Sequence, residues 1–255
     1  MELGSAQAVV TGAASGLGLA LARRIVAAGG KATLLDLQQE AGQAAAAGLG
    51  PSAHFIRCDV TEEAAVEAAV REGQARMGGL TLAVACAGIG TPGKLLGRDG
   101  PMSAAFFQRI LSVNVGGTFN LGRAAAALMQ HNAPDAGGER GLIVHTASVA
   151  AWEGQVGQVA YSASKAAVVG MVLPMARELA RFGIRVMAVA PGLFATPMLA
   201  GLPQEVQDSL GAQVPFPSRL GQPDEFADLV AAIYANPMLN GSAIRLDGAI
   251  RMQPR

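Results

Sequence analysis

Seven short apolar runs alternate with longer amphipathic stretches along the whole chain. A continuous apolar run is typical of a strand that is buried on both faces, and strands that alternate with helices are typical of a parallel sheet. The predicted strands are residues 6–11, 31–36, 53–58, 80–86, 141–147, 184–190 and 242–246. The pattern predicts one α/β domain over residues 1–255: a Rossmann-type, doubly wound parallel sheet of about seven strands with helices on both faces.

The clearest helical patterns cover residues 61–77 and 223–237. Thr61 is a plausible N-cap for the first of them, because acidic residues follow it and suit the positive end of a helix. The chain contains no low-complexity tract or repeat that would divide it.

The composition fits a large core and argues against several classes of function. Hydrophobic residues make up 51% of the 255 and charged residues 15%. Nineteen basic side chains balance nineteen acidic ones, so nothing predicts binding to nucleic acid or to an anionic membrane. Cys58 and Cys86 lie far apart and the histidines are scattered, so we expect no metal site.

The beginning of the chain and its apolar stretches give no targeting or membrane signal. Residues 1–12 lack both a basic segment followed by an apolar one and an Arg-rich amphipathic presequence. The best candidate for a membrane span, 159–173, contains Lys165 and has a helical pattern. We therefore expect a cytoplasmic protein that does not enter a membrane.

A glycine-rich turn, TGAASGLG, joins the first predicted strand to a helical pattern. Gly12, Gly16 and Gly18 would let the backbone approach a pyrophosphate, and the helix N-terminus would supply free N–H groups. Ser15 and Leu17 lie within the same turn. Alone, such a pattern indicates a tight turn as often as a ligand site, but its place between strand and helix favours a dinucleotide.

Asp36 ends the second predicted strand, where a carboxylate can bind a ribose 2′-OH. It would repel the 2′-phosphate of NADP by several kcal/mol at about 5 Å and an effective dielectric of about 20. Ala14, Ser15 and Leu37 supply no cation that would offset this repulsion. We therefore predict NAD as the cofactor. The alternative role for Asp36 is to cap the helix that follows.

The carboxyl ends of parallel strands line the ligand crevice of a doubly wound sheet. Asp59 and Gly88, at the ends of the third and fourth strands, are therefore candidate cofactor contacts. Further candidates are Val60, Cys86, Pro191, Gly192, Phe194 and Thr196. Asp59 would bind the adenine amino group, with a loop cap as an equally weighted alternative.

YSASK places Tyr161 and Lys165 one helical turn apart on the same helix face. The spacing is either accidental or a means of making a tyrosine titrate near pH 7. Ser148 follows the fifth predicted strand, and Asn114 lies in a helical region between the fourth and fifth strands.

Taken together, these motifs resemble the short-chain dehydrogenase/reductase family. TGxxxGxG, ACAG in place of the common NNAG, an Asn in the central helix, Ser before YxxxK, and PG after the sixth strand follow the family's order over essentially the whole chain. Longer stretches, among them TASVAAWEGQVGQVAYSASK and RLDGAIRMQP, resemble the type II 3-hydroxyacyl-CoA dehydrogenases.

That resemblance implies NAD-dependent interconversion of 3-hydroxyacyl-CoA and 3-ketoacyl-CoA in fatty-acid or branched-chain acyl degradation. It also implies a homotetramer and a mobile lid over residues 193–221. Two alternatives stay open: an NAD-dependent hydroxysteroid or secondary-alcohol dehydrogenase, and an NADPH-dependent 3-ketoacyl reductase, which Asp36 disfavours. A non-catalytic NAD-binding subunit is a further alternative, which the intact Ser148, Tyr161 and Lys165 set disfavours.

The resemblance also implies roles for individual residues. Tyr161 is the general acid and base, Ser148 binds the substrate oxygen, and Asn114 holds a water that links Lys165 to solvent. Lys165 binds the nicotinamide ribose and, at about 4 Å and an effective dielectric of about 20, would offer the roughly 4 kcal/mol that moves a tyrosine pKa from about 10 to about 7. Burial opposes this shift, so the positive charge of oxidised nicotinamide is expected to contribute as well. Gln155 is expected to contact substrate together with Ser148 and Tyr161.

Two departures from the family pattern matter. Ala85 replaces an Asn, which puts in doubt a hydrogen bond that stabilises the sheet near the cofactor. His145 replaces another Asn, and we expect it to be buried and hydrogen-bonded.

The predicted lid is apolar and suits an acyl chain or a steroid equally well. Its apolar residues are Leu193, Phe194, Met198, Leu199, Leu202, Val214 and Phe216. Lys94, Arg98 and Arg219 are the cations available for the phosphates of a CoA substrate.

Overall fold

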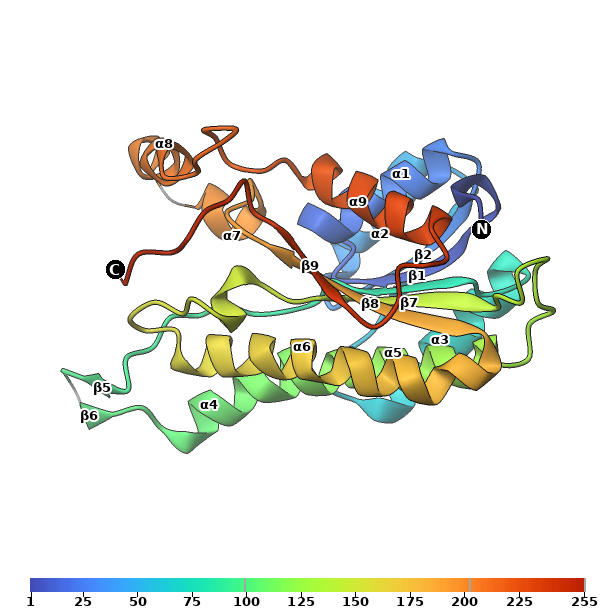
Figure 1. Ribbon diagram of the computed structural model, residues 1–255, viewed down its shortest axis with the longest axis horizontal. Helices are drawn as coiled ribbons and strands as arrows, with labels where there is room; N and C mark the ends of the chain where they lie inside the picture. The colour runs from blue at the N-terminus through green and yellow to red at the C-terminus, as the bar shows by residue number, and fades with distance from the viewer. Residues whose placement is uncertain (99, 202, 255) are drawn as a thin grey trace.

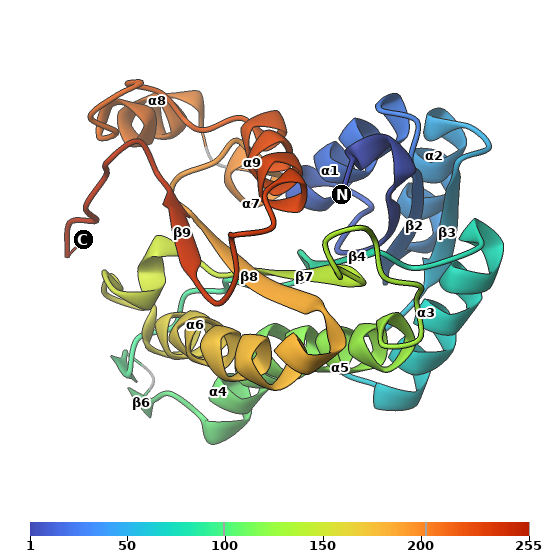
Figure 2. The same cartoon turned by 45° about the vertical axis from the view of Figure 1, so that its right-hand side comes forward.

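A computed structural model describes residues 1–98, 100–201 and 203–254. Leu202 of the predicted lid lies outside the described residues, as does the side chain of Met198. The chain folds around a seven-stranded sheet in the order β3-β2-β1-β4-β7-β8-β9, in which every pair of neighbours is parallel (Figure 1, Figure 2). The predicted Rossmann-type α/β class is confirmed.

All seven predicted strands are present, each within two residues of its expected ends. They are β1 Gln7–Thr11, β2 Lys31–Asp36, β3 Ala53–Arg57, β4 Leu82–Ala85, β7 Gly141–Thr146, β8 Ile184–Pro191 and β9 Ala243–Leu246. A small antiparallel hairpin of β5 (Leu96–Gly97) and β6 (Gly100–Pro101) was not predicted, because two residues per strand leave no apolar run.

Helices cover both faces of the sheet, with α1, α2 and α9 on one and α3, α5 and α6 on the other (Figure 1). Their bounds are α1 Gly16–Ala27, α2 Gln39–Leu49, α3 Glu63–Met77, α4 Ala104–Leu111, α5 Gly117–Met129, α6 Val159–Leu179, α7 Pro197–Ala200, α8 Gln204–Ala212 and α9 Pro223–Ala235. Every residue of β7 and β8 is buried, which explains their continuous apolar runs. Leu21 and Phe226 fill the core on one face, and Leu121 and Val168 fill it on the other.

The predicted first residue is wrong for α3 and confirmed for α9. The predicted cap Thr61 is wrong: α3 begins at Glu63 after Glu62, because the N–H and hydroxyl of Thr61 bond to Asp59 Oδ1 at 2.9 and 2.8 Å. Helix α9 begins at Pro223 as predicted, behind a capping box formed by Gln222 and Glu225.

One described helix, α6 with the turn that continues it to Phe182, is long and apolar enough to cross a membrane by length and composition. Its residues Val168, Val172 and Ala176 are buried in the core against the sheet. A helix buried in a protein core can have the same length and composition, so these two properties of α6 are not evidence that it crosses a membrane.

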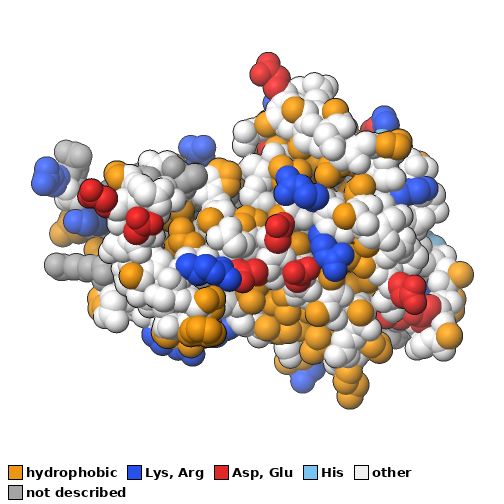
Figure 3. Space-filling model, turned by 90° about the horizontal axis from the view of Figure 1, so that it is seen from above, with side chains coloured by type: hydrophobic (Ala, Val, Ile, Leu, Met, Phe, Trp, Pro, Cys, Tyr) orange, Lys and Arg blue, Asp and Glu red, His pale blue; other side chains and the backbone are white. Residues whose placement is uncertain are grey.

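Charges of both signs are interspersed on the face above α1, α8 and α9 (Figure 3). That face therefore shows no broad field of one sign, in keeping with the equal numbers of basic and acidic residues in the sequence.

Candidate functional site

The glycine-rich turn fits a ligand phosphate because side chains are excluded from it. Gly12 has a φ of +64°, and a Cβ there would lie 2.7 Å from the Ala87 nitrogen. A Cβ on Gly18 would lie 2.5 Å from the Gly12 oxygen, so helix α1 packs directly on the turn. Ser15 is the N-cap residue of α1 and forms no side-chain cap within the described chain. The first N–H groups of α1 are therefore available to an anion.

The remaining residues of this turn connect it to the lid and the core. Gly16 has a φ of +56°, and a Cβ there would lie 3.4 Å from Pro197, the first residue of α7. Thr196 lies close by, at 3.8 Å from the same position. Leu17 turns its side chain to the core formed with α9. The start of the predicted lid thus lies beside the phosphate-binding turn.

Asp36 is hydrogen-bonded to the glycine-rich turn. Its Oδ2 accepts from the Ala14 N–H at 3.0 Å and its Oδ1 from the Gln38 N–H at 3.1 Å. Each carboxylate oxygen keeps a second lone pair for a ribose hydroxyl. Gln38 is the N-cap residue of α2, so the alternative role of Asp36 as that helix's cap is not observed.

Arg57 is a cation near Asp36 that the sequence reasoning missed. Strand pairing sets Arg57 opposite Asp36, and its Nε lies 3.4 Å from the carbonyl oxygen of Leu37. Arg57 lies far along the chain from both Asp36 and the glycine-rich turn, so no local pattern relates it to them. The register of β2 against β3 is the signal that would have found Arg57.

At the end of β3, Asp59 acts as a loop cap through Oδ1, which holds both donors of Thr61. Val60 is buried, and its carbonyl accepts from the Asn120 amide at 2.9 Å. Contact of Asp59 and Val60 with adenine stays a prediction.

At the end of β4, Thr11 supplies a hydrogen bond near the point where Ala85 leaves an amide missing. Its hydroxyl accepts from the Ala87 N–H at 3.2 Å, and its carbonyl accepts from the Cys86 N–H at 3.2 Å. Burial raises the pKa of the Cys86 thiol to about 11, so this thiol is neutral at pH 7 and a poor nucleophile.

Ser148, Tyr161 and Lys165 come together at the carboxyl edge of the sheet. The side chain of Ser148, which follows β7, interacts with the hydroxyl of Tyr161 and acts to lower its pKa. Lys165 Nζ lies 5.7 Å from the centroid of the Tyr161 ring and donates to the Thr146 carbonyl at 2.8 Å. Helix α6 therefore presents Tyr161 and Lys165 to the serine, as the spacing of YSASK predicts.

Burial dominates the electrostatics of this group. Burial lowers the pKa of Lys165 to about 8. Burial also raises the pKa of Tyr161, and the Ser148 side chain opposes that rise. Desolvation of the phenolate therefore dominates among the groups of this chain. The expected fall of the Tyr161 pKa, which also includes the positive charge of oxidised nicotinamide, stays a prediction.

Asn114 ties α6 to the chain that follows β4. It lies fully buried in a π-helical segment, Ser112–Gly116. Its Oδ1 accepts from the Ile89 N–H at 2.8 Å, and its Nδ2 donates to the Ile89 carbonyl and to Ser164 Oγ, each at 2.9 Å. Ser164 Oγ in turn donates to the Tyr161 carbonyl at 2.6 Å. Asn114 therefore positions Tyr161 through Ser164, a residue to which the sequence reasoning gave no role.

Gly88 lies between these groups, since a Cβ there would be 3.2 Å from Asn114 Oδ1 and 3.6 Å from Lys165 Nζ. A side chain at this position would therefore crowd the lysine. The water that Asn114 was expected to hold for Lys165 stays a prediction.

His145 lies in β7, away from this group, and faces α5 and α6. It is fully buried as expected, but neither ring nitrogen has a hydrogen-bond partner among the described residues, so the expected hydrogen bond is wrong. A Cβ on Gly122 would lie 3.3 Å from the imidazole Cε1 and 2.9 Å from the Met175 methyl group, so the ring is packed between apolar atoms.

The end of β8 leads into the lid. Pro191 ends β8, and a Cβ on Gly192 would lie 2.9 Å from the Cβ of Asp247. Phe194 is buried and forms an isolated bridge with Gly221, which brings the two ends of segment 193–221 together. The segment is therefore a loop with joined ends that carries α7 and α8.

The remaining lid residues differ in exposure, and both Arg219 and Gln155 have partners within the protein. Phe216 is 83% exposed, whereas Val214 is buried. Arg219 forms a two-pronged ion pair with Glu225 at 2.7 and 3.0 Å, so it is not a free cation for a CoA phosphate. Gln155 donates from its amide to the Gln253 carbonyl at 2.9 Å, and its contact with substrate stays a prediction.

The chain matches the family described as short chain dehydrogenase over residues 6–207. It is 55% identical to the 3-hydroxyacyl-CoA dehydrogenase type-2 of Homo sapiens over 249 residues, which cover 97% of this chain and 95% of the human one. The Drosophila melanogaster protein of the same name is 50% identical over 252 residues, covering 98% and 99% of the two chains.

Solved structures show the same similarity. The crystal structure of 3-hydroxyacyl-CoA dehydrogenase type-2 from Mycobacterium avium is 41% identical with a TM-score of 0.94, covering 99% of this chain and 98% of that one. A 3-ketoacyl-(acyl-carrier-protein) reductase from Brucella melitensis, complexed with NADH, is 28% identical with a TM-score of 0.85, covering 96% and 98%. The family implies NAD or NADP as cofactor, and the excluded side chains of the glycine-rich turn fit such a dinucleotide. This chain belongs to the short-chain dehydrogenase/reductase family.

Proposed function

We propose that this protein interconverts 3-hydroxyacyl-CoA and 3-ketoacyl-CoA with NAD, in fatty-acid or branched-chain acyl degradation. The observation that carries the proposal is the group of Ser148, Tyr161 and Lys165 at the sheet edge of a chain 55% identical, over nearly its whole length, to a human enzyme of that name.

The residues of the chain account for the proton and the substrate oxygen. When bound, the nicotinamide exchanges a hydride with the substrate carbon. Tyr161 Oη takes the proton of the substrate hydroxyl in oxidation and returns it in reduction. Ser148 Oγ, which faces Tyr161, holds the same substrate oxygen and fixes its orientation. Lys165, held by the Thr146 carbonyl beside the tyrosine ring, donates to ribose hydroxyls.

The choice of NAD rests on Asp36, whose carboxylate repels a 2′-phosphate. The Asp36→Ala variant is expected to lose at least about tenfold in kcat/KM for NADH and to gain about as much for NADPH, because Arg57 is then the nearby charge. The double variant Asp36→Ala/Arg57→Ala should lose that gain. A wild-type preference for NADPH would contradict the assignment of NAD.

Recognition of CoA is expected at the rim near Lys94 and Arg98, both exposed. The Gly93 N–H donates to the Gly157 carbonyl at 2.8 Å, which brings the segment before Lys94 against the loop that joins Ser148 to Tyr161. The Lys94→Gln/Arg98→Gln variant should raise KM for acetoacetyl-CoA several-fold, by about 1 kcal/mol of lost binding, and leave KM for acetoacetyl-pantetheine unchanged.

The substrate class is tested by the ratio of kcat/KM for acetoacetyl-CoA to that for a steroid ketone, each with NADH. The proposal predicts a ratio well above one. A steroid ketone reduced more efficiently than acetoacetyl-CoA would replace the acyl-CoA assignment with the hydroxysteroid alternative.

We propose a homotetramer in which the outer faces of α5 and α6 meet a second copy. Phe119 of α5 and Val159 and Leu173 of α6 are 47%, 46% and 44% exposed, so these two helices present apolar side chains that a second copy would bury. Light scattering should give a mass four times the chain mass of 25.8 kDa, and Phe119→Arg/Leu173→Glu should lower it. A wild-type monomer would contradict the proposal.

A further inference from the structure

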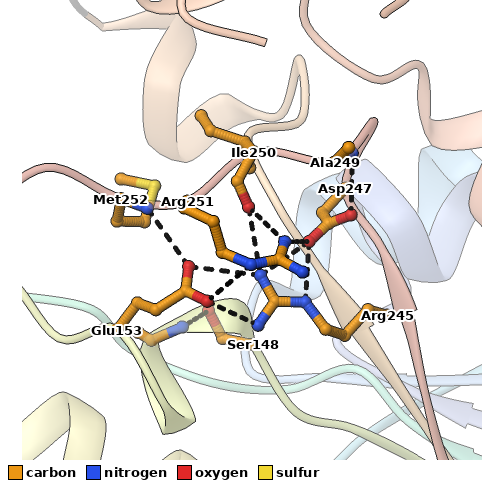
Figure 4. Close-up of polar contacts among 9 residues, drawn as sticks. Ser148, Glu153, Arg245, Asp247, Ala249, Ile250, Arg251 and Met252 are labelled. Atoms are coloured by element: carbon orange, nitrogen blue, oxygen red, sulfur yellow. Dashed lines mark hydrogen bonds and ion pairs between the residues drawn. The ribbon is translucent and has the colours of Figure 1, made fainter. Parts of the chain in front are cut away.

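A network of ion pairs ties the loop after Ser148 to the C-terminal end of the chain (Figure 4). At its centre, Glu153 accepts from Arg245 Nη1 and Nη2 at 2.8 and 3.2 Å and from the Met252 N–H at 3.1 Å. Arg251 Nε lies 3.3 Å from the same carboxylate. The side chains of Glu153 and Arg245 are 20% and 24% exposed, so water screens their pair less than it screens a pair on the open surface.

Arg245 also joins the two carboxylates of the network. Its Nε and Nη2 lie 2.8 and 2.7 Å from Asp247 Oδ2, and Nη2 donates to the Ile250 carbonyl at 3.1 Å. The guanidinium lies over the ring of Trp152, 5.5 Å from its centroid. These partners fix the guanidinium on several sides at once.

Short hydrogen-bonded steps connect Ser148 to Glu153. The Ala151 N–H donates to the Ser148 carbonyl at 3.0 Å, and the Glu153 N–H donates to the Val149 carbonyl at 3.1 Å. The Ser148 hydroxyl accepts from the Ala150 N–H at 3.2 Å. These bonds join the backbone of Glu153 to that of Ser148 within one short turn.

The other end of the network touches the cofactor side and the lid. Gly192, at the end of β8, packs on Asp247, as the 2.9 Å between their Cβ positions shows. Gly248 has a φ of +57°, and a Cβ there would lie 2.4 Å from Val214 of the lid. The Phe216 N–H donates to the Gly248 carbonyl at 3.3 Å. The segment after β9 thus contacts both the turn at the end of β8 and the lid.

We propose that Glu153 and Arg245 are positioning residues of the dehydrogenase site. They hold the Ser148 loop against the C-terminal segment, and with it the position of the Ser148 side chain beside Tyr161. Because Ser148 orients the substrate oxygen and does not hold the cofactor, their effect falls on turnover rather than on cofactor affinity. The inference rests on the proposed function, because that function makes Ser148 the residue that orients the substrate oxygen.

The kinetic test compares Glu153→Gln and Arg245→Met with wild type in acetoacetyl-CoA reduction. We expect kcat to fall at least about tenfold while KM for NADH stays within about twofold, and Arg245→Lys to restore part of the loss. Asp228→Asn and Arg24→Met are matched controls, because these residues form an exposed ion pair at 2.9 Å between α1 and α9. An unchanged kcat, or a parallel loss of NADH binding, would overturn the proposal.

Hydrogen exchange tests, without a substrate, whether the ion-pair network holds the Ser148 loop to the C-terminal segment. In Glu153→Gln, well below its unfolding temperature, peptides covering 148–153 and 249–254 should exchange faster than in wild type, and peptides of α1 should not. Unchanged exchange at 148–153 overturns the inference. If the wild type leaves acetoacetyl-CoA unreduced, the proposed function fails, while the exchange result still decides whether the network holds the loop.

Discussion

At the scale of single residues, His145 makes stability depend on pH. Burial lowers the pKa of its imidazole from 6.5 to about 4, so the folded chain keeps the ring neutral where the unfolded chain protonates it. Between these two values the unfolded state binds more protons, and the free energy of unfolding therefore falls as the pH falls. The contribution of His145 is present above pH 6.5 and is lost progressively towards pH 4.

We predict that the free energy of unfolding drops by about 2 kcal/mol more in wild type than in His145→Leu between pH 7 and pH 5. Urea unfolding at the two pH values measures the difference. His131→Gln, at an exposed position after α5, controls for the loss of a histidine. Equal drops in wild type and His145→Leu would show that this imidazole does not carry the pH dependence.

The residues that could be predicted from the sequence are those with local signals. Tyr161 and Lys165 share one helix face, and the glycines of the first turn follow directly on a strand, so spacing alone relates them. Glu153 and Arg245 are 92 positions apart, and no local pattern relates them. The same holds for Asn114 and Ser164, which meet only because α6 packs beside the π-helical segment.

At the scale of elements, Arg185 joins strand β8 to the end of helix α9. It is 5% exposed and forms an ion pair with Glu139. Its guanidinium donates to carbonyls at and beyond the end of α9, namely those of Ile233, Tyr234, Asn236 and Leu239. One cation thus satisfies carbonyl groups that a helix end leaves open and complements the negative end of the helix dipole.

Arg185→Met should lower the free energy of unfolding by at least about 3 kcal/mol, because it leaves the Glu139 carboxylate buried without its partner. Arg185→Met/Glu139→Gln should recover part of the loss. Urea unfolding at pH 7 measures both, and Arg24→Met, from an exposed pair, is the matched control. A single variant within about 1 kcal/mol of wild type would contradict this role for Arg185.

Strands and helices could be predicted from the sequence where the hydrophobic pattern alone determines their position. A strand buried on both faces appears in the sequence as an apolar run, and for this reason all seven strands of the main sheet were found. The start of α3 was misplaced because Asp59, at the end of the preceding strand, takes both donors of Thr61. Arg185 lies inside an apolar run, and the sequence does not reveal that its partners are the last carbonyls of α9.

At the scale of the whole molecule, the parallel sheet gathers the site from distant parts of the chain. Gly12, Asp36, Gly88, Ser148 and Gly192 each follow or end a different strand, and the carboxyl ends of these strands share one edge. The order of motifs predicted this gathering. The contact of the C-terminal segment with the Ser148 loop and the lid was not predicted, since it depends on how the chain returns after β9.

The central claim is that Tyr161 moves the proton in acyl-CoA reduction. Its most direct test is kcat for acetoacetyl-CoA with NADH in Tyr161→Phe, with NADH binding measured by fluorescence on the same preparation. A positioned acid or base contributes about 10²- to 10⁴-fold, so the account predicts a loss of at least about 100-fold with NADH affinity kept. A variant that binds NADH and keeps more than about a tenth of wild-type kcat would contradict it.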